Sequence, residues 1–168
     1  MKAAYISERS LVNEFVKLGN GAKIWHFCNI YGEKEKPVII GDDTYIGSYS
    51  EIKPGVEISN NCRFQSYVFI PEGVTIKDYV FLGPRVTFTN DKYPSAIKTI
   101  KKIWKLEKTQ VDSHATICAN SVIGPGVNIG KYSLVGMGSV VIEDVPDYAV
   151  VYGNPAKIRG EIKTPILQ

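Results

Sequence analysis

Bulky apolar residues recur at every sixth position along most of the chain. These anchors form three runs, at Val12, Leu18, Ile24 and Ile30; at Ile40, Ile46, Ile52, Ile58, Phe64, Ile70, Ile76, Leu82 and Phe88; and at Val111, Ile117, Ile123, Ile129, Val135 and Val141. A small or β-branched residue, such as Cys28, Thr44 or Val56, stands two residues before most anchors. Positions two apart on a strand share one face, so each hexad predicts a short strand that buries two side chains. A helix would space its apolar residues by three and four, so the pattern predicts an all-β chain.

Turn residues fill the rest of each hexad. Gly follows many anchors, and bends are indicated at Pro54-Gly55, Glu72-Gly73 and Pro125-Gly126. The pattern resembles the hexapeptide repeat of the left-handed parallel β-helix, in which three hexads make one triangular coil. On this resemblance we expect a prism over roughly residues 18 to 160, in a single domain that comprises residues 1–168.

Two interruptions break the period. The spacing of ten between Ile30 and Ile40 predicts a polar bulge at 32–37, which we interpret as a solvated loop. The spacing of 23 between Phe88 and Val111 predicts a long excursion loop at about 89–110, where lysines outnumber acidic residues. This loop is either solvated surface or a contact to phosphates. After Val141 the repeat ends, and residues of about 143–168 are expected to form a short C-terminal cap.

Composition and charge limit the possible functions. The chain has 168 residues, of which 44% are hydrophobic, as in one soluble domain. A net charge of +3 is too slight to indicate a nucleic-acid binder. No apolar run approaches the ~20 residues of a membrane helix, and Lys2, Glu8 and Arg9 interrupt the start where a secretory signal would be apolar. We therefore expect a cytoplasmic protein that binds neither nucleic acid nor membrane.

Cysteine and histidine usage gives no indication of a metal site. The three cysteines form no CxxC pair, and there are only two histidines. Cys28 and Cys62 belong to the inward column of small residues, so packing is their expected role. Cys118 follows an anchor and is expected to be exposed.

Residues 18 apart in an unbroken stretch should stack at the same corner, one coil apart. Glu72 and Asn90 differ by 18, and Asp91 follows where the long loop leaves the prism. Two carboxylates and an amide could hold an amine by hydrogen bonds and accept its proton. The alternative is that Glu72 and Asn90 are only favourable turn residues.

The two histidines are predicted at other places. His114 is expected at a different corner, stacked between Tyr79 and Tyr132. It is either a general base or a structural residue. His26 stands among aromatic residues and is a candidate for contact with a flat ring of a ligand, with packing as the alternative.

Four segments resemble one branch of the hexapeptide acyltransferases. They are Ile24-Trp25-His26-Phe27-Cys28-Asn29-Ile30, Val80-Phe81-Leu82-Gly83-Pro84, Phe88-Thr89-Asn90 with Pro94 downstream, and Val135-Gly136-Met137-Gly138-Ser139-Val140-Val141. This branch comprises nucleotide-sugar N-acetyltransferases that act on 3-amino-3-deoxy sugars in O-antigen and related surface-glycan biosynthesis. The closing segments Asp144-Val145-Pro146 and Gly153-Asn154-Pro155-Ala156-Lys157 resemble those of many hexapeptide acetyltransferases and favour acyl-CoA use.

The resemblance implies a homotrimer with active sites between neighbouring prisms. It implies acetyl-CoA as acyl donor along the C-terminal coils and a nucleotide-linked amino sugar as acceptor, with Asn90 binding the amine. It also implies that Gly136 approaches the pantetheine through its backbone. Asn154 would belong to the cofactor-binding segment, and Lys157 and Arg159 would face the CoA phosphates.

The expected mechanism is direct transfer, in which a neutral amine attacks the thioester and the CoA thiolate leaves. Two alternatives stay open at this point. One is O-acetylation of a sugar or another small acceptor, for which His114 would be required as the base because a hydroxyl is a weaker nucleophile. The other is a noncatalytic trimeric β-helix scaffold.

Overall fold

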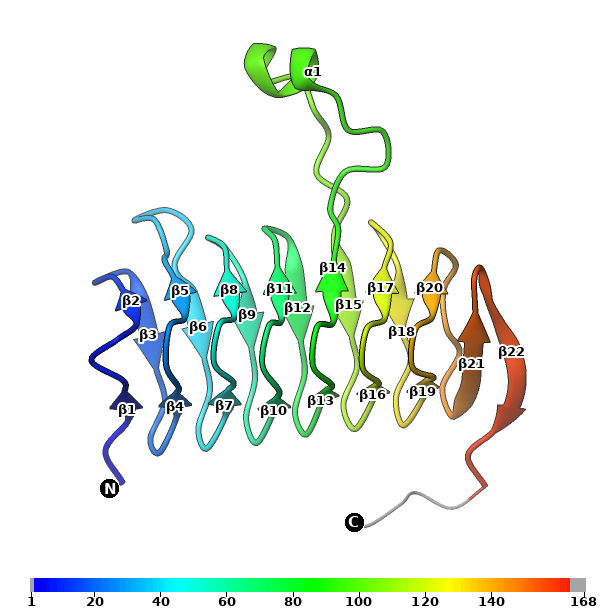
Figure 1. Cartoon of the computed structure of the whole chain (residues 1–168), viewed down its shortest axis with the longest axis horizontal. Coiled ribbons are helices and arrows are strands. Elements are labelled where there is room, and N and C mark those ends of the chain that lie inside the picture. Colours follow the sequence, from blue (N-terminus) through cyan, green and yellow to red (C-terminus); the bar gives the residue numbers. More distant parts are fainter. Residues whose placement is uncertain (1, 164–168) are drawn as a thin grey trace.

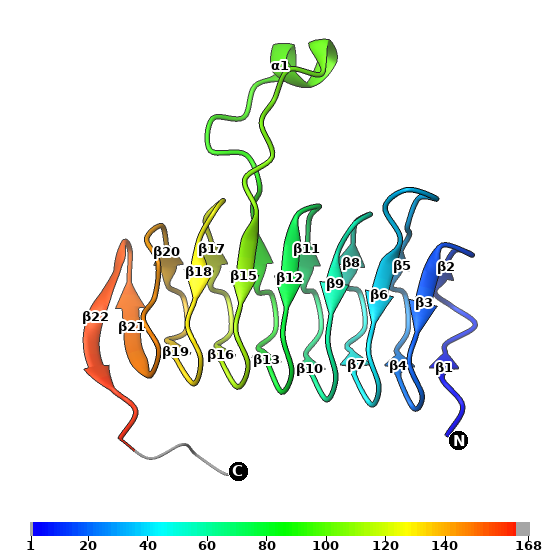
Figure 2. The ribbon, with the colours of Figure 1, turned by 180° about the vertical axis from the view of Figure 1, so that it is seen from behind.

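The computed structural model describes residues 2–163, which wind into a left-handed parallel β-helix (Figure 1). Each full turn adds one short strand to each of three sheets, which we call faces 1, 2 and 3. The view from behind shows the same ladder of coils, with the long loop standing away from it (Figure 2). The predicted all-β class and three-sided repeat are confirmed.

The three faces are built almost entirely from two- and three-residue strands. Face 1 contains β1 (Tyr5–Ile6), β4 (Lys23–Ile24), β7 (Tyr45–Ile46), β10 (Arg63–Phe64), β13 (Phe81–Leu82), β16 (Thr116–Ile117), β19 (Leu134–Val135), β21 (Ala149–Gly153) and β22 (Ala156–Glu161). Face 2 contains β2 (Leu11–Val12), β5 (Asn29–Ile30), β8 (Glu51–Ile52), β11 (Phe69–Ile70), β14 (Thr87–Phe88), β17 (Val122–Ile123) and β20 (Val140–Val141). Face 3 contains β3 (Val16–Leu18), β6 (Val38–Ile40), β9 (Glu57–Ile58), β12 (Val74–Ile76), β15 (Thr109–Val111) and β18 (Asn128–Ile129).

Both inward columns form the core. The anchors from Ile24 to Val141 are buried, as are the small residues two positions before them. The hydroxyls in the small column are paired with the backbone. For example, Ser50 Oγ donates to the Gly47 carbonyl at 2.7 Å and accepts from the Val68 N–H at 3.2 Å. The column therefore tolerates Ser and Thr without leaving a polar group unpaired.

The cysteines follow their expected positions in part. Cys28 and Cys62 are buried, as predicted, whereas Cys118 is half-buried rather than exposed. Burial raises the pKa of the Cys62 thiol to about 11, because the thiolate would lose its solvation. Packing is thus the role that the structure gives to Cys62.

The prism begins earlier in the chain than expected. We expected it from about residue 18, but β1 already pairs in parallel with β4 through Tyr5 and Ile6. Residues at this end are exposed to solvent because no coil covers them, which weakens their periodic signal. At the other end β21 and β22 pair antiparallel and close the last coil, within the cap predicted at about 143–168; residues 164–168 of that prediction lie outside the described residues.

Three corners join the faces, and left-handed backbone recurs at all of them. Between faces 2 and 3 glycines such as Gly55 and Gly73 adopt it, whereas residues with side chains adopt it at the other two corners. At the corner between faces 1 and 2, Phe27, Tyr49 and Tyr67 have φ near +60° and their rings stack with centroids 5.0 and 4.9 Å apart. A left-handed conformation costs about 1 to 2 kcal/mol in a residue with a side chain. Stacking of the rings offsets part of that cost.

The corner between faces 2 and 3 carries both interruptions. The bulge at 31–37 links β5 to β6, and a long arm links β14 to β15. The arm includes a short helix, α1 (Ala96–Lys101), which the sequence pattern did not reveal, and it projects from the prism (Figure 1). No residue of α1 is buried.

Within residues 2–163 no helix has the length and apolarity needed to cross a membrane.

Candidate functional site

The arm and the bulge border a cavity at the corner between faces 2 and 3, which we call the corner cavity. Its volume is about 470 Å³. It is lined by Tyr31, Glu33, Lys53, Pro54, Phe69, Pro71, Glu72, Asn90, Asp91, Pro94, Thr99 and Trp104. Glu72, Asn90 and Asp91 therefore meet at one site, as the stacking argument predicted.

Strand register explains why these residues meet. Phe69 on β11 pairs with Thr87 on β14, so positions 18 apart lie on neighbouring coils. Beyond the arm, Val74 pairs with Thr109, so the chain returns to the same corner and resumes its register. The arm therefore inserts residues at the corner without shifting the strands that support Glu72 and Asn90.

Asn90 is fixed by the main chain below it. Its Nδ2 donates to the carbonyl oxygen of Glu72 at 3.0 Å, which sets the orientation of the amide. Among the described residues, no hydrogen bond engages Asn90 Oδ1. An amide held in this way offers its free oxygen as an acceptor to a ligand.

The Glu72 side chain has a different partner from the one that the stacking suggested. Lys36 Nζ lies 2.6 Å from Glu72 Oε1. The hydrogen bond to Glu72, followed by the attraction between the charges, raises the pKa of Lys36. The bulge at 31–37 is therefore not merely a solvated loop, because Lys36 pairs with the cavity residue Glu72 and Glu33 lines the cavity.

Another lysine, Lys53, lines the cavity itself. Lys53 forms an ion pair with Glu51, and its ammonium lies 3.2 Å from the phenolic oxygen of Tyr31. The hydrogen bond to Glu51 is the main cause of the raised pKa of Lys53, against a smaller effect of burial. Lys53 is thus held as a cation on one side of the cavity.

Aromatic residues give the cavity an apolar surface. Tyr31 comes from the bulge, Phe69 from β11 and Trp104 from the returning limb of the arm. Rings beside carboxylates and an amide can contact the apolar face of a polar ligand while the polar groups bind its substituents. Trp104 lies outside the periodic part of the chain, and only its position in a long insertion could have indicated this role.

The two histidines lie at the other two corners. His114 stacks between Tyr79 and Tyr132, with centroids 4.8 and 4.5 Å away, as predicted. His26 Nδ1 lies 2.5 Å from Ser7 Oγ, at the corner between faces 1 and 2. Within one chain, neither histidine joins Asn90 in the corner cavity.

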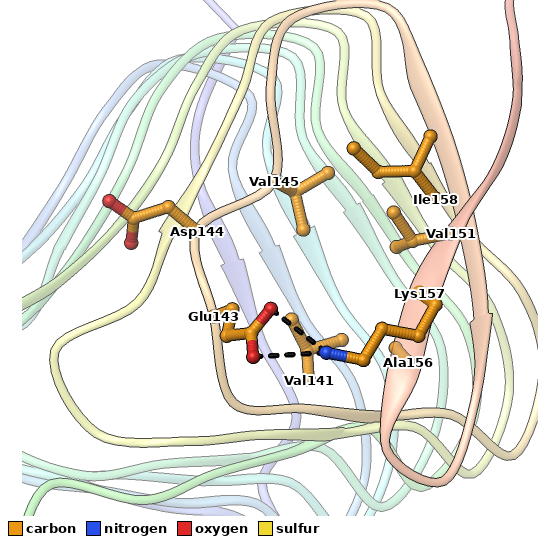
Figure 3. A pocket seen from close by; sticks show the side chains of 8 residues that line it. All are labelled: Val141, Glu143, Asp144, Val145, Val151, Ala156, Lys157 and Ile158. Carbon is orange, nitrogen blue, oxygen red and sulfur yellow. Dashed lines mark hydrogen bonds and ion pairs between the residues drawn. The ribbon is translucent and has the colours of Figure 1, made fainter.

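The candidate cofactor residues lie at the C-terminal end of the prism. Lys157 on β22 pairs with both carboxylate oxygens of Glu143, at 3.0 and 3.1 Å (Figure 3). This pair borders a second cavity of about 340 Å³. The cavity is lined by Val141, Glu143, Asp144, Val145, Val151, Ala156, Lys157 and Ile158.

Three further candidate residues lie at the same end of the prism but do not line this cavity: Gly136, Asn154 and Arg159. A Cβ on Gly136 would lie 2.8 Å from Cβ of Tyr152, so close packing of the terminal hairpin explains this glycine. Arg159 lies over the Tyr152 ring, 5.6 Å from its centroid. Asn154 is exposed in the turn between β21 and β22. Lys157 and Arg159 could offer positive charge to an anionic ligand here.

Two family models match the repeats of the chain. Residues 37–71 match the bacterial transferase hexapeptide (six repeats), and residues 112–143 match the hexapeptide repeat of succinyl-transferase. Both segments fall on uninterrupted coils of the prism. The chain therefore contains the hexapeptide repeat of these transferase families. The family resemblance that the sequence motifs indicated is confirmed.

Curated relatives match parts of this hexapeptide-repeat chain. A dTDP-3-amino-3,6-dideoxy-alpha-D-galactopyranose 3-N-acetyltransferase of Aneurinibacillus thermoaerophilus is 56% identical over 55 residues, covering 33% of this chain and 29% of the relative. A galactoside O-acetyltransferase of Lactococcus lactis is 30% identical over 90 residues, covering 53% of this chain and 44% of the relative. The chain spans less than half the length of these relatives.

Solved structures share the fold. A galactoside acetyltransferase in complex with coenzyme A matches with a TM-score of 0.57 at 25% identity, covering 88% of this chain and 66% of that one. AntD, an N-acyltransferase from Bacillus cereus, was solved with dTDP-4-amino-4,6-dideoxyglucose and coenzyme A. It matches with a TM-score of 0.55 at 23% identity, covering 96% of this chain and 83% of that one.

Proposed function

We propose that the chain is an acetyl-CoA-dependent N-acetyltransferase. Its acceptor would be the amino group of a nucleotide-linked 3-amino-3-deoxy sugar, used for O-antigen or a related surface glycan. The observation that carries the proposal is the corner cavity, where the free Oδ1 of Asn90 lies with the carboxylates of Glu72 and Asp91. The 56% identity to part of a 3-N-acetyltransferase supports the choice of acceptor.

The corner cavity suits an amine. In the proposed reaction, Asn90 Oδ1 accepts a hydrogen bond from the acceptor nitrogen, and Glu72 or Asp91 takes up its proton. A nitrogen–carbon bond then forms at the acyl carbon as the carbon–sulfur bond breaks, and the thiolate of CoA leaves. Because a deprotonated amine is already a good nucleophile, orientation supplies most of the acceleration, up to roughly 7 to 11 kcal/mol.

Acetyl-CoA is proposed to bind toward the C-terminal coils. Lys157 and Arg159 on β22 are exposed cations that can approach its phosphates. The ion pair between Lys157 and Glu143 is exposed, so a phosphate can replace the carboxylate at little cost. Gly136 and Asn154 would contact the pantetheine arm through the backbone. Acetyl-CoA as donor fits a cytoplasmic reaction.

A homotrimer belongs to the same proposal, and the arm supports it. Ile97, Ile100 and Ile103 are 62%, 79% and 64% exposed on a segment that projects from the prism. A six-residue helix is too short to be stable in water without tertiary packing. A neighbouring copy of the chain would cover these side chains. In such an assembly, a histidine from another corner could approach the cavity of its neighbour.

O-acetylation is the second candidate, favoured by the similarity to galactoside O-acetyltransferases. A hydroxyl acceptor requires a general base, and His114 would then be essential. The chain could also be a scaffold without activity. Calorimetry separates the scaffold from both enzymes, because only the enzymes bind acetyl-CoA.

The proposed function is tested by release of thiol from acetyl-CoA. The acceptors are paired nucleotide sugars that differ only in an amino or a hydroxyl group at carbon 3. We expect thiol release with the amino sugars alone. Release only with the hydroxyl sugars would establish the O-acetyltransferase, and release with neither member of any pair would refute the proposal.

A further inference from the structure

Lys36 engages a carboxylate of the corner cavity from outside the repeat. Its Nζ lies 2.6 Å from Oε1 of Glu72. The bulge fixes the position of Lys36 through its backbone, because its N–H donates to the Glu33 carbonyl and its own carbonyl accepts from the Gly55 N–H, both at 3.0 Å. The side chain is therefore free to move while the backbone stays in place.

Gly55 leaves the path between the two residues open. A Cβ on Gly55 would lie 3.7 Å from Cβ of Lys36 and 3.8 Å from Cγ of Glu72. The coil between the bulge and Glu72 thus presents no side chain at this point. The Lys36 side chain can therefore pass over Gly55 and bring its ammonium to the Glu72 carboxylate.

The Lys36 ammonium that pairs with Glu72 is chemically similar to the amino group of the proposed acceptor sugar. Both are primary amines that carry a positive charge when protonated. The neighbouring Asn90 is bound to the same residue, through the main-chain carbonyl of Glu72. An ammonium on Glu72 therefore lies beside the residue that we expect to bind the acceptor nitrogen.

We propose that Lys36 determines acceptor specificity, because its ammonium competes with the amino group of the acceptor for the carboxylate of Glu72. This inference rests on the proposed function. An amino sugar that enters the cavity replaces one ammonium by another, so the carboxylate keeps a cationic partner. A hydroxyl sugar offers no charge in exchange and does not displace Lys36. Lys36 thereby favours amines over hydroxyls.

The exchange is easy because the ion pair is open to solvent. The side chains of Lys36 and Glu72 are 48% and 25% exposed. Exposed ion pairs contribute little to stability, so displacement of Lys36 should weaken acceptor binding by about two- to fivefold. Removal of the ammonium should strengthen binding by the same factor.

The test compares Lys36→Met, which removes the ammonium and keeps an unbranched side chain, with Lys34→Met in the same bulge. Thiol release is measured with acetyl-CoA and a dTDP-linked 3-amino-3,6-dideoxy sugar. We expect Lys36→Met to lower the KM for the sugar about two- to fivefold with kcat unchanged. Lys34→Met and Lys36→Arg should keep the wild-type KM. In a Glu72→Gln background, Lys36→Met should have no effect on KM.

The outcomes separate the inference from the proposed function. If the wild-type chain turns over the amino sugar but Lys36→Met leaves KM unchanged or raises it, the inference is wrong and the proposed function stands. An equal fall in KM in the Glu72→Gln background also overturns the inference. If the wild-type chain releases no thiol with any amino sugar, the proposed function fails, and the role of Lys36 fails with it.

Discussion

Replacement of Asn90 by Ala removes Oδ1, the atom that we propose accepts a hydrogen bond from the substrate amine. A hydrogen bond to a charged group contributes about 1.5 to 3 kcal/mol, so kcat/KM should fall about 10- to 150-fold. The same change removes the bond from Nδ2 to the Glu72 carbonyl, at 3.0 Å. Loss of that bond costs about 1 kcal/mol of unfolding free energy, and the melting temperature should fall by about 2 to 4 °C.

Asn13 provides a matched control for this variant. Its Nδ2 donates to the Gly32 carbonyl and its Oδ1 accepts from the Gly32 N–H, both at 3.0 Å, at the same corner but on the first coil. Asn13→Ala should lower the melting temperature by at least as much as Asn90→Ala and leave kcat/KM unchanged. Thiol release at saturating acetyl-CoA and a thermal melt are measured for both variants. Equal kcat/KM for Asn90→Ala and the wild type would refute the assignment of the amine site.

Three further predictions concern other parts of the molecule. His114 has a φ of +65°, a conformation that Asn tolerates, so His114→Asn should fold normally. We expect this variant to retain a substantial fraction of the thiol-release activity. Near-complete loss of activity would establish the imidazole as the base. Burial raises the pKa of the Cys62 thiol from 9.0 to about 11, so the free energy of unfolding should fall as the pH rises through that range. Denaturant melts of the wild type and Cys62→Ala measure this fall, which should be smaller in the variant. Gly136→Ala should lower the melting temperature because its methyl group would collide with Tyr152, and an unchanged melt would contradict the packing account.

The repeat made the prism predictable from the sequence. A fixed period places each anchor, such as Ile52, on an inward strand position, and the same period stacks Glu72 beneath Asn90. His114 could be placed between two tyrosines for the same reason, since the arm returns the chain to its register. Periodicity therefore determines both the core and the corner at which each residue lies.

The contacts of the two insertions could not be predicted in the same way. Residues in an insertion have no register, so nothing in the spacing relates Lys36 to Glu72 or brings Trp104 to the cavity. The helix α1 was missed because six residues are too few to give a helical period. The coil at Tyr5 was missed because residues at an uncovered end are exposed and need not be apolar.

The position of the acceptor nitrogen tests the account most directly. A crystal structure of the chain with coenzyme A and a dTDP-linked 3-amino-3,6-dideoxy sugar would show it. We predict the nitrogen within about 2.6 to 3.2 Å of Asn90 Oδ1, with Lys36 displaced from Glu72. A sugar bound away from Asn90, or an amine that contacts neither Asn90 nor Glu72, would contradict the account.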